Sequence, residues 1–154
     1  MTLKAIFVFR GHRGFYYIEK AWAQPAEEEQ KMKEIAIKEN HLYNKTYTRG
    51  KRFVGRYVAV YVLKDLAAKR LKNENPQKEY INRLGITATK KIGGAVCRNR
   101  AKRIIRAAYR AYSDKLRTGY LIVISARGAI VGRKSSEIDA ELSKAFEKLE
   151  MIKA

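Results

Sequence analysis

Hydrophobic residues along the chain follow two kinds of repeat, which predict strands in some segments and helices in others. Residues 56–63 carry valine at every second position, as in a half-buried strand whose valines face the core. Residues 120–126, YLIVISA, form a continuous β-branched run that is typical of a buried central strand. Residues 81–89 predict a further strand. These segments together predict one central sheet.

A short helix is predicted before the first of these strands. It begins at Asn40, a residue type that caps helices well, and runs to about Thr48. Gly50 stands where a helix of this length would end. Tyr43 and Tyr47 are four residues apart, so one face of the helix presents both aromatic rings.

The C-terminal segment predicts a helix that lies on the sheet, beginning at about Ser136. Its apolar positions step by four and three residues: Ile138, Leu142, Ala145, Leu149 and Ile152. Residues 64–80 are charged, contain Asn75-Pro76 and lack an apolar stripe, which predicts a long connection or a poorly packed helix. Strands mixed with helices of these lengths indicate an α/β (α+β) domain with one central sheet.

Residues 90–110 hold eight cations and no acid. On a helix, the apolar residues of this segment fall on one arc: Cys97, Ala101, Ile104, Ile105, Ala108 and Tyr112. Most of the cations fall opposite: Arg98, Lys102, Arg103, Arg106 and Arg110. Like charges four residues apart destabilise an isolated helix, and bound phosphates would offset that repulsion. We therefore expect a polyanion on this face and a core position for Cys97.

Charge is the dominant feature of the composition. The chain has 154 residues, and 34 Lys plus Arg against 15 Asp plus Glu give a net charge of +19. Nucleic acid is the expected partner, with an anionic membrane surface as the weaker alternative. Residues 1–31 are nearly neutral, so the charge belongs to residues 32–154, which we expect to form one domain. The first 31 residues then lie outside this domain. Either translation naturally starts at Met32 and these residues are an extension of the assigned sequence, or they form a genuine hairpin appendage.

Several classes of protein are disfavoured by the sequence. Cys97 is the single cysteine, and with only His12 and His41 beside it a structural zinc site is not expected. Gly93-Gly94 lacks the Lys-Ser/Thr of a phosphate-binding loop. No set of carboxylates, histidines or nucleophiles suggests a catalytic centre. Without a spanning segment or signal sequence, the expected location is the cytoplasm.

Residues 83–106, RLGITATKKIGGAVCRNRAKRIIR, closely resemble the signature of the bacterial ribonuclease P protein subunit. The match includes the Arg-Asn-Arg core, the preceding Lys-Lys and the following Lys-Arg at the family's spacing, and weaker likeness extends over about residues 35–152. Two departures are visible. The family usually has Phe where Tyr43 and Tyr47 stand, and the 64–80 connection is longer than usual.

The resemblance implies a fold and a role. The fold would be a two-layer α/β sandwich like the second domain of ribosomal protein S5, with a left-handed crossover through the basic helix, a rare handedness. The role would be that of a protein subunit that assists a catalytic RNA in removing the 5′ leader from precursor tRNA, and broadens substrate use by binding the leader. Its partners would be that RNA and precursor tRNA, with no stable protein partner, and Mg²⁺ would act mainly through the RNA.

The resemblance also implies roles for individual residues. The set that would bind the RNA subunit is Lys90, Lys91, Arg98, Asn99, Arg100, Lys102, Arg103 and Arg106. The set that would line a cleft for the single-stranded leader is Tyr43, Tyr47, Arg56 and Tyr61. Aromatic faces stack on unpaired bases of any sequence, although the tyrosines would also serve as ordinary core residues. A different RNA- or DNA-binding protein, such as a ribosomal component, is the competing interpretation.

Overall fold

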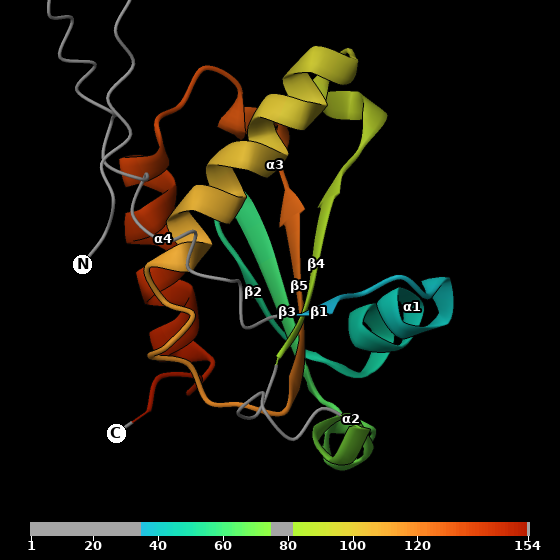
Figure 1. The fold of residues 1–154 in the computed structure, drawn as a ribbon. Coiled ribbons are helices and arrows are strands. Elements are labelled where there is room, and N and C mark those ends of the chain that lie inside the picture. The colour runs from blue at the N-terminus through green and yellow to red at the C-terminus, as the bar shows by residue number, and fades with distance from the viewer. Residues whose placement is uncertain (1–34, 75–81, 154) are drawn as a thin grey trace, which may run out of the picture. The chain divides into compact units, whose positions relative to one another are not determined.

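The computed structural model describes residues 35–74 and 82–153 (Figure 1). The expectations for residues 1–31 and for Ile81 therefore lie outside the described ranges. The strands in these ranges are β1 (Ile35–Ala36), β2 (Lys51–Val54), β3 (Val58–Lys64), β4 (Arg83–Ala88) and β5 (Tyr120–Ala126). The α-helices are α1 (Asn40–Arg49), α2 (Ala68–Glu74), α3 (Ala95–Arg110) and α4 (Ser135–Lys148). Two 3-10 turns, η1 (Lys90–Ile92) and η2 (Gly128–Ile130), complete the described elements.

The strands form one mixed sheet in the order β1-β4-β5-β3-β2. Strand β5 is central, as its apolar sequence predicts. It pairs parallel with β4 and antiparallel with β3. Strand β3 begins at Val58 rather than at 56, because Gly55 closes the turn from β2 by donating its N–H to the Val58 carbonyl. The predicted central strand is confirmed over its whole length.

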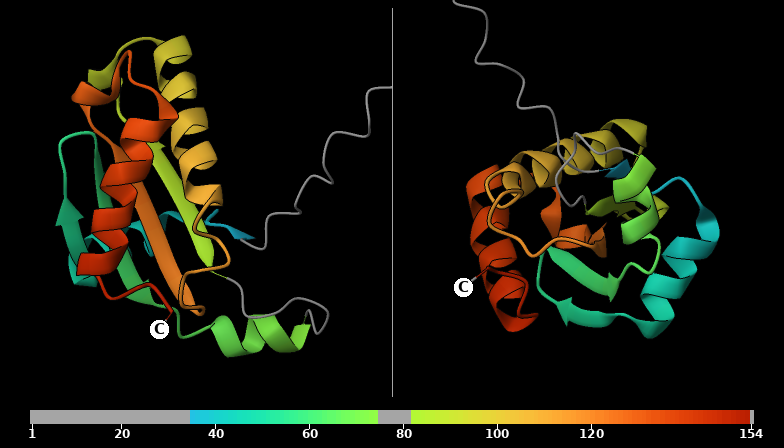
Figure 2. Two further views of the ribbon diagram at one scale, coloured as in Figure 1. Left: turned by 90° about the vertical axis from the view of Figure 1, so that its left-hand side faces the viewer. Right: turned by 60° about the horizontal axis from the view of Figure 1, so that its bottom comes forward.

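Alternating residues of β3 and β5 build two separate cores on the two faces of the sheet. Figure 2 shows the helices on these two faces from two further sides. The predicted valines of β3, together with Ile122 and Ile124 of β5, point toward α3 and α4 and belong to the larger core. Leu121 and Val123 point to the other face, where they pack with Leu42 of α1. Successive residues of these strands thus contribute to the cores on opposite faces of the sheet.

Helix α3 connects the adjacent parallel strands β4 and β5 by the left-handed crossover that the family resemblance implies. In Figure 1 both strands run upward, β5 lies to the left of β4, and α3 passes in front of the sheet. Helices α3 and α4 pack side by side on that front face, and α1 covers the back. The predicted α/β fold with one central sheet is confirmed.

Helix α2 belongs to the 64–80 segment, which the sequence left open between a connection and a helix. An ion pair ties the two ends of this segment together. Arg83 Nε and Nη2 lie 2.6 and 2.7 Å from the Asp65 carboxylate, and the side chains are only 12% and 3% exposed. Asp65 also accepts the N–H of Ala67 just before α2. The long connection therefore closes at its base against the start of β4.

Helix ends differ from prediction in two places. Asn40 is the first helical residue rather than the cap; Glu39 precedes it, with its carboxylate 3.2 Å from His41 Nε2 and no bond to the helix N–H groups. Ile152 lies beyond α4, where it pairs with Leu116 in an isolated bridge. The predicted stripe of α4 is otherwise buried, with Phe146 added to it.

Candidate nucleic-acid interface

The start of α3 is built by η1 and two glycines. Lys90 and Lys91 are exposed on η1, while Ile92 between them and the helix is buried in the larger core. Gly93 has a φ of +129°, a conformation that other residues rarely adopt, and Gly94 precedes the helix without any side-chain cap. The first N–H groups of α3 therefore point outward at the positive end of the helix dipole, which attracts anions.

Arg98 does not lie on the outer side of α3, contrary to the predicted arc. It is half-buried, and its Nη1 donates to the Gly93 carbonyl at 2.7 Å. The helix buries four residues: Ala101, Ile105, Ala108 and Tyr109. The half-buried cations each stand three residues before a buried one: Arg98 before Ala101, Lys102 before Ile105, and Arg106 before Tyr109. Residues three apart are neighbours on a helix, so these cations flank the core side.

The outward side of α3 carries the remaining predicted contacts of this helix, Asn99, Arg100 and Arg103, which are exposed. Arg110 of the predicted cationic arc is exposed as well. Cys97 is exposed as well, so its predicted core position is wrong. The first turn of α3 rises above the end of β5 (Figure 1), and Ile92 fills the core at that level in its place.

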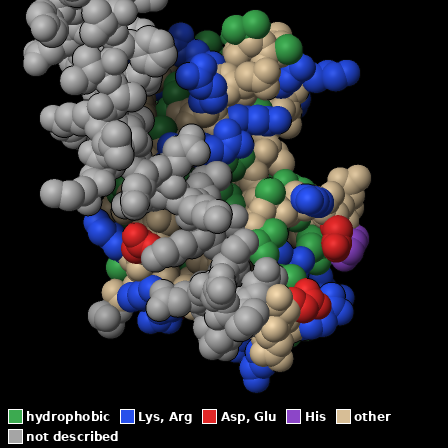
Figure 3. All heavy atoms as spheres, viewed as in Figure 1, with side chains coloured by type: hydrophobic (Ala, Val, Ile, Leu, Met, Phe, Trp, Pro, Cys, Tyr) green, Lys and Arg blue, Asp and Glu red, His purple; other side chains and the backbone are tan. Residues whose placement is uncertain are grey.

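The cations of α3 have no carboxylate partners within residues 35–74 and 82–153. Blue side chains follow the helix across the front of the molecule (Figure 3). Because unpaired guanidinium and ammonium groups repel one another, this surface favours an anionic ligand that spans several of them. Repeated phosphates meet that requirement.

The back face of the sheet carries an aromatic cluster beneath α1. The rings of Tyr47 and Tyr61 meet edge to face, with centroids 4.8 Å apart and planes at 85°. The hydroxyls of Tyr47 and Thr87 are 3.0 Å apart. Tyr47, Tyr61 and Thr87 are all half-buried, so each residue keeps part of its surface exposed.

Tyr43 lies deeper in this cluster than the sequence suggests. Its hydroxyl donates to the Ile37 carbonyl at 3.2 Å, and a Cβ placed on Gly85 would come within 2.5 Å of its ring. Glycine at position 85 thus makes room for the aromatic ring. Burial, and secondly the nearby Tyr47, raise the pKa of Tyr43 above its usual value. Its phenol stays neutral and protonated.

Arg56 stands apart from the three tyrosines. It is exposed in the turn between β2 and β3, with its guanidinium carbon 5.7 Å from the centre of the Tyr57 ring. Tyr61 lies three residues into β3, about 10 Å from its start, and Arg56 precedes that start by two residues. The cation directly opposite Tyr61 is instead Arg52 on β2. No sequence pattern singles out Arg52, because only the register of the 51–64 hairpin places it opposite Tyr61.

Within the described ranges, no group of three or more histidine, cysteine or carboxylate side chains is placed to hold a metal ion. Nor do the helices of these ranges include one with the length and apolar character needed to cross a membrane. The two surfaces that remain are the cationic side of α3 and the tyrosine cluster under α1.

Comparisons with known proteins agree on one family. The family model described as Ribonuclease P matches residues 32–150. The ribonuclease P protein component of Clostridium acetobutylicum is 36% identical over 121 residues, covering 79% of this chain and 93% of the relative. The corresponding protein of Clostridioides difficile is 34% identical over 107 residues, covering 69% and 83%.

Solved structures share the fold. The RNase P protein of Staphylococcus aureus superposes with a TM-score of 0.61 at 24% identity, covering 77% of this chain and 97% of that one. The RNase P protein of Thermotoga maritima gives a TM-score of 0.53 at 22% identity, covering 66% and 86%.

Proposed function

Because the chain belongs to the bacterial ribonuclease P protein family, whose members assist the catalytic RNA in 5′ processing of precursor tRNA, we propose that it binds RNA through both faces of its sheet. The front face, with α3, takes the RNA subunit. The back face, with the tyrosine cluster, takes the single-stranded leader of the precursor. The observation that carries this proposal is the row of unpaired cations along α3.

The contact with the RNA subunit is assigned to η1 and α3. Arg100 and Arg103 point outward and are free to grip phosphate oxygens, while Lys90 and Lys91 extend the same charge beyond the helix start. The half-buried cations, Arg98, Lys102 and Arg106, border this surface and add positive potential at its edge. Asn99 offers a neutral hydrogen-bonding group in the first turns.

The contact with the leader is assigned to Tyr47 and Tyr61, with Tyr43 supporting them from below. A base stacked against a half-buried aromatic ring contributes about 1–3 kcal/mol with little regard to its sequence. This tolerance suits a subunit that meets many different leaders, and it would broaden the range of substrates. Arg56 remains the cation that the family resemblance assigns to this cleft.

The chemistry is assigned to the RNA subunit, with this chain as the protein part of the endonuclease. Mg²⁺ would be held mainly by RNA phosphates, and the cations of α3 would lower the magnesium concentration needed by neutralising part of the RNA charge. The family match over residues 32–150 supports 32–154 as the binding domain, with residues 1–31 outside it. We place the chain in the cytoplasm, with RNA rather than another protein as its stable partner.

Reconstitution tests the proposal. The full chain is mixed with the ribonuclease P RNA of the same organism, and leader cleavage is followed at low magnesium, where the RNA alone is slow. The protein should restore cleavage and should prefer this RNA to ribosomal RNA or duplex DNA at matched salt. Absence of stimulation would contradict the role, and equal affinity for all three nucleic acids would favour a general nucleic-acid-binding protein.

A further inference from the structure

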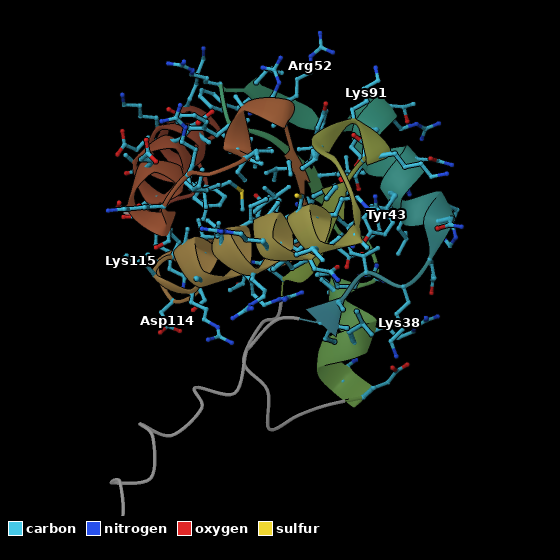
Figure 4. All side chains as sticks on the ribbon, turned by 90° about the horizontal axis from the view of Figure 1, so that it is seen from above. Lys38, Tyr43, Arg52, Lys91, Asp114 and Lys115 are labelled. Atoms are coloured by element: carbon cyan, nitrogen blue, oxygen red, sulfur yellow. The ribbon has the colours of Figure 1, made fainter. Side chains whose placement is uncertain are left out.

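The edge strand β2 contributes a cation to the tyrosine face. In the antiparallel pair of β2 and β3, Arg52 lies directly opposite Tyr61. Directly opposed residues of such a pair project to the same side of the sheet with Cβ atoms about 5 Å apart. Tyr61 belongs to the cluster under α1, so Arg52 belongs to that face too. Figure 4 shows Arg52 at the β2 edge of the sheet, away from α3.

Arg52 has no ion-pair partner among residues 35–74 and 82–153. Its side chain is exposed, and none of the ion pairs within the described ranges includes it. The neighbouring Lys51 faces the other way and lies 3.5 Å from Glu150. Val54 lies two residues beyond Arg52 on the same face and is 54% exposed, so the sheet surface beside the arginine is uncovered. The guanidinium is therefore free to bind an external anion.

We infer that Arg52 binds a phosphate of the precursor leader next to the base that stacks at Tyr47 and Tyr61. The inference rests on the proposed leader surface and supplies the cation that Arg56, in the turn before β3, is poorly placed to provide. A single-stranded nucleotide carries its phosphate beside an exposed aromatic base. The cross-strand pair of an open ring and an unpaired guanidinium matches those two groups.

The test compares Arg52→Ala with Lys51→Ala, a matched control one residue away on the opposite face. Each variant is assembled with the RNA subunit, and affinity is measured for precursor tRNA and for mature tRNA over a range of salt. Arg52→Ala should weaken binding of the precursor about fivefold and reduce its log–log salt slope by about 0.7, the value for one phosphate of a single strand. Mature tRNA, which lacks the leader, should bind unchanged. Lys51→Ala should leave the affinity for both precursor and mature tRNA unchanged.

Two further arms separate the alternatives. Arg52→Lys should keep most of the salt slope because it retains the charge. A leader in which one phosphate is replaced by a neutral methylphosphonate should weaken binding to the wild-type chain but not further weaken binding to Arg52→Ala. If the loss of affinity from the methylphosphonate adds to that from Arg52→Ala at every position of the leader, the inference is overturned. It is also overturned if Arg56→Ala weakens precursor binding and Arg52→Ala does not.

Failure of this inference is distinguishable from failure of the proposed function. If Tyr47→Ala lowers the preference for precursor and Arg52→Ala does not, the leader surface stands and the role of Arg52 is rejected. If the wild-type complex shows no preference for precursor over mature tRNA, the leader surface itself is rejected.

Discussion

The two faces of the sheet use the same strands for opposite purposes. On the front face, β3 and β5 sit beneath α3 and α4 in the larger core, and the charged groups are carried on the outer side of a helix. On the back face the buried cluster is small, and half-buried tyrosines stand at its border. The difference separates two kinds of surface: exposed cations on the outer side of a helix that covers the larger core, and half-buried tyrosines of α1 and β3 around a small buried cluster.

The largest expected difference between the faces is in stability. Ile105 is fully buried under α3, and Ile105→Ala should lower the free energy of unfolding by about 2–5 kcal/mol through the lost contacts and the cavity. Leu42 on the back face keeps 8% exposure, so Leu42→Ala should fall near the lower end of that range, about 2 kcal/mol. Urea unfolding of both variants measures the difference. Equal losses would mean that the back face is as much a core as the front.

Base stacking should give the next largest effect. Tyr47→Ala removes the ring that faces Tyr61 and should cost precursor binding about 1–3 kcal/mol, with mature tRNA unaffected. Tyr47→Phe is the matched control: it keeps the ring, loses only the hydroxyl contact with Thr87, and should preserve most of the preference. An equal loss in both variants would place the importance in the hydroxyl and not in the aromatic face.

Single phosphate contacts on the front face should have smaller effects. Arg100→Ala and Arg103→Ala should each weaken affinity for the RNA subunit about fivefold and reduce the salt slope by about 0.9 per contact. Lys144→Ala, an exposed cation on α4, serves as the control and should leave both quantities unchanged. Thermal unfolding should barely move in these variants. If these variants lose thermal stability together with RNA affinity, the arginines have a structural role and not a role in phosphate binding.

The smallest effects concern ionisation at alkaline pH. Burial raises the pKa of Tyr43 on the back face and, as the main cause, of Tyr112 between α3 and α4. Folding therefore favours the neutral phenol, and this stabilisation is present below pH 10 and lost as pH rises through the raised pKa. Tyr43→Phe and Tyr112→Phe should each flatten the loss of unfolding free energy above pH 10. A steeper loss in either variant would contradict the direction of the shift.

Sequence patterns predicted the three longer strands and the helices α1, α3 and α4 from their regular apolar spacing, whereas the short edge strands β1 and β2 were not predicted. The run at 120–126 could only be buried on both sides, and the alternating valines could only face one core. The wheel of α3 was less informative. Its periodicity does not show which residue lies at the centre of the contact between α3 and the core. Arg98, Lys102 and Arg106 were therefore predicted to point outward, although they flank the core.

What the sequence could not supply depends on distant partners. Arg52 meets Tyr61 only through the register of a hairpin, and Asp65 meets Arg83 across 18 residues that hold no common pattern. Cys97 was misplaced because its burial depends on where β5 ends relative to the helix. Each of these contacts is set by tertiary geometry and not by local propensity.

The closed base of the α2 segment has one more consequence. The Asp65–Arg83 ion pair holds the two ends of this segment together. The pairing of the strands on either side therefore does not depend on the length of the chain between them. Lengthening a loop that is already closed adds little entropic cost. A fluorophore or a fused module inserted in this segment should therefore leave the pairing of the strands that it connects unchanged.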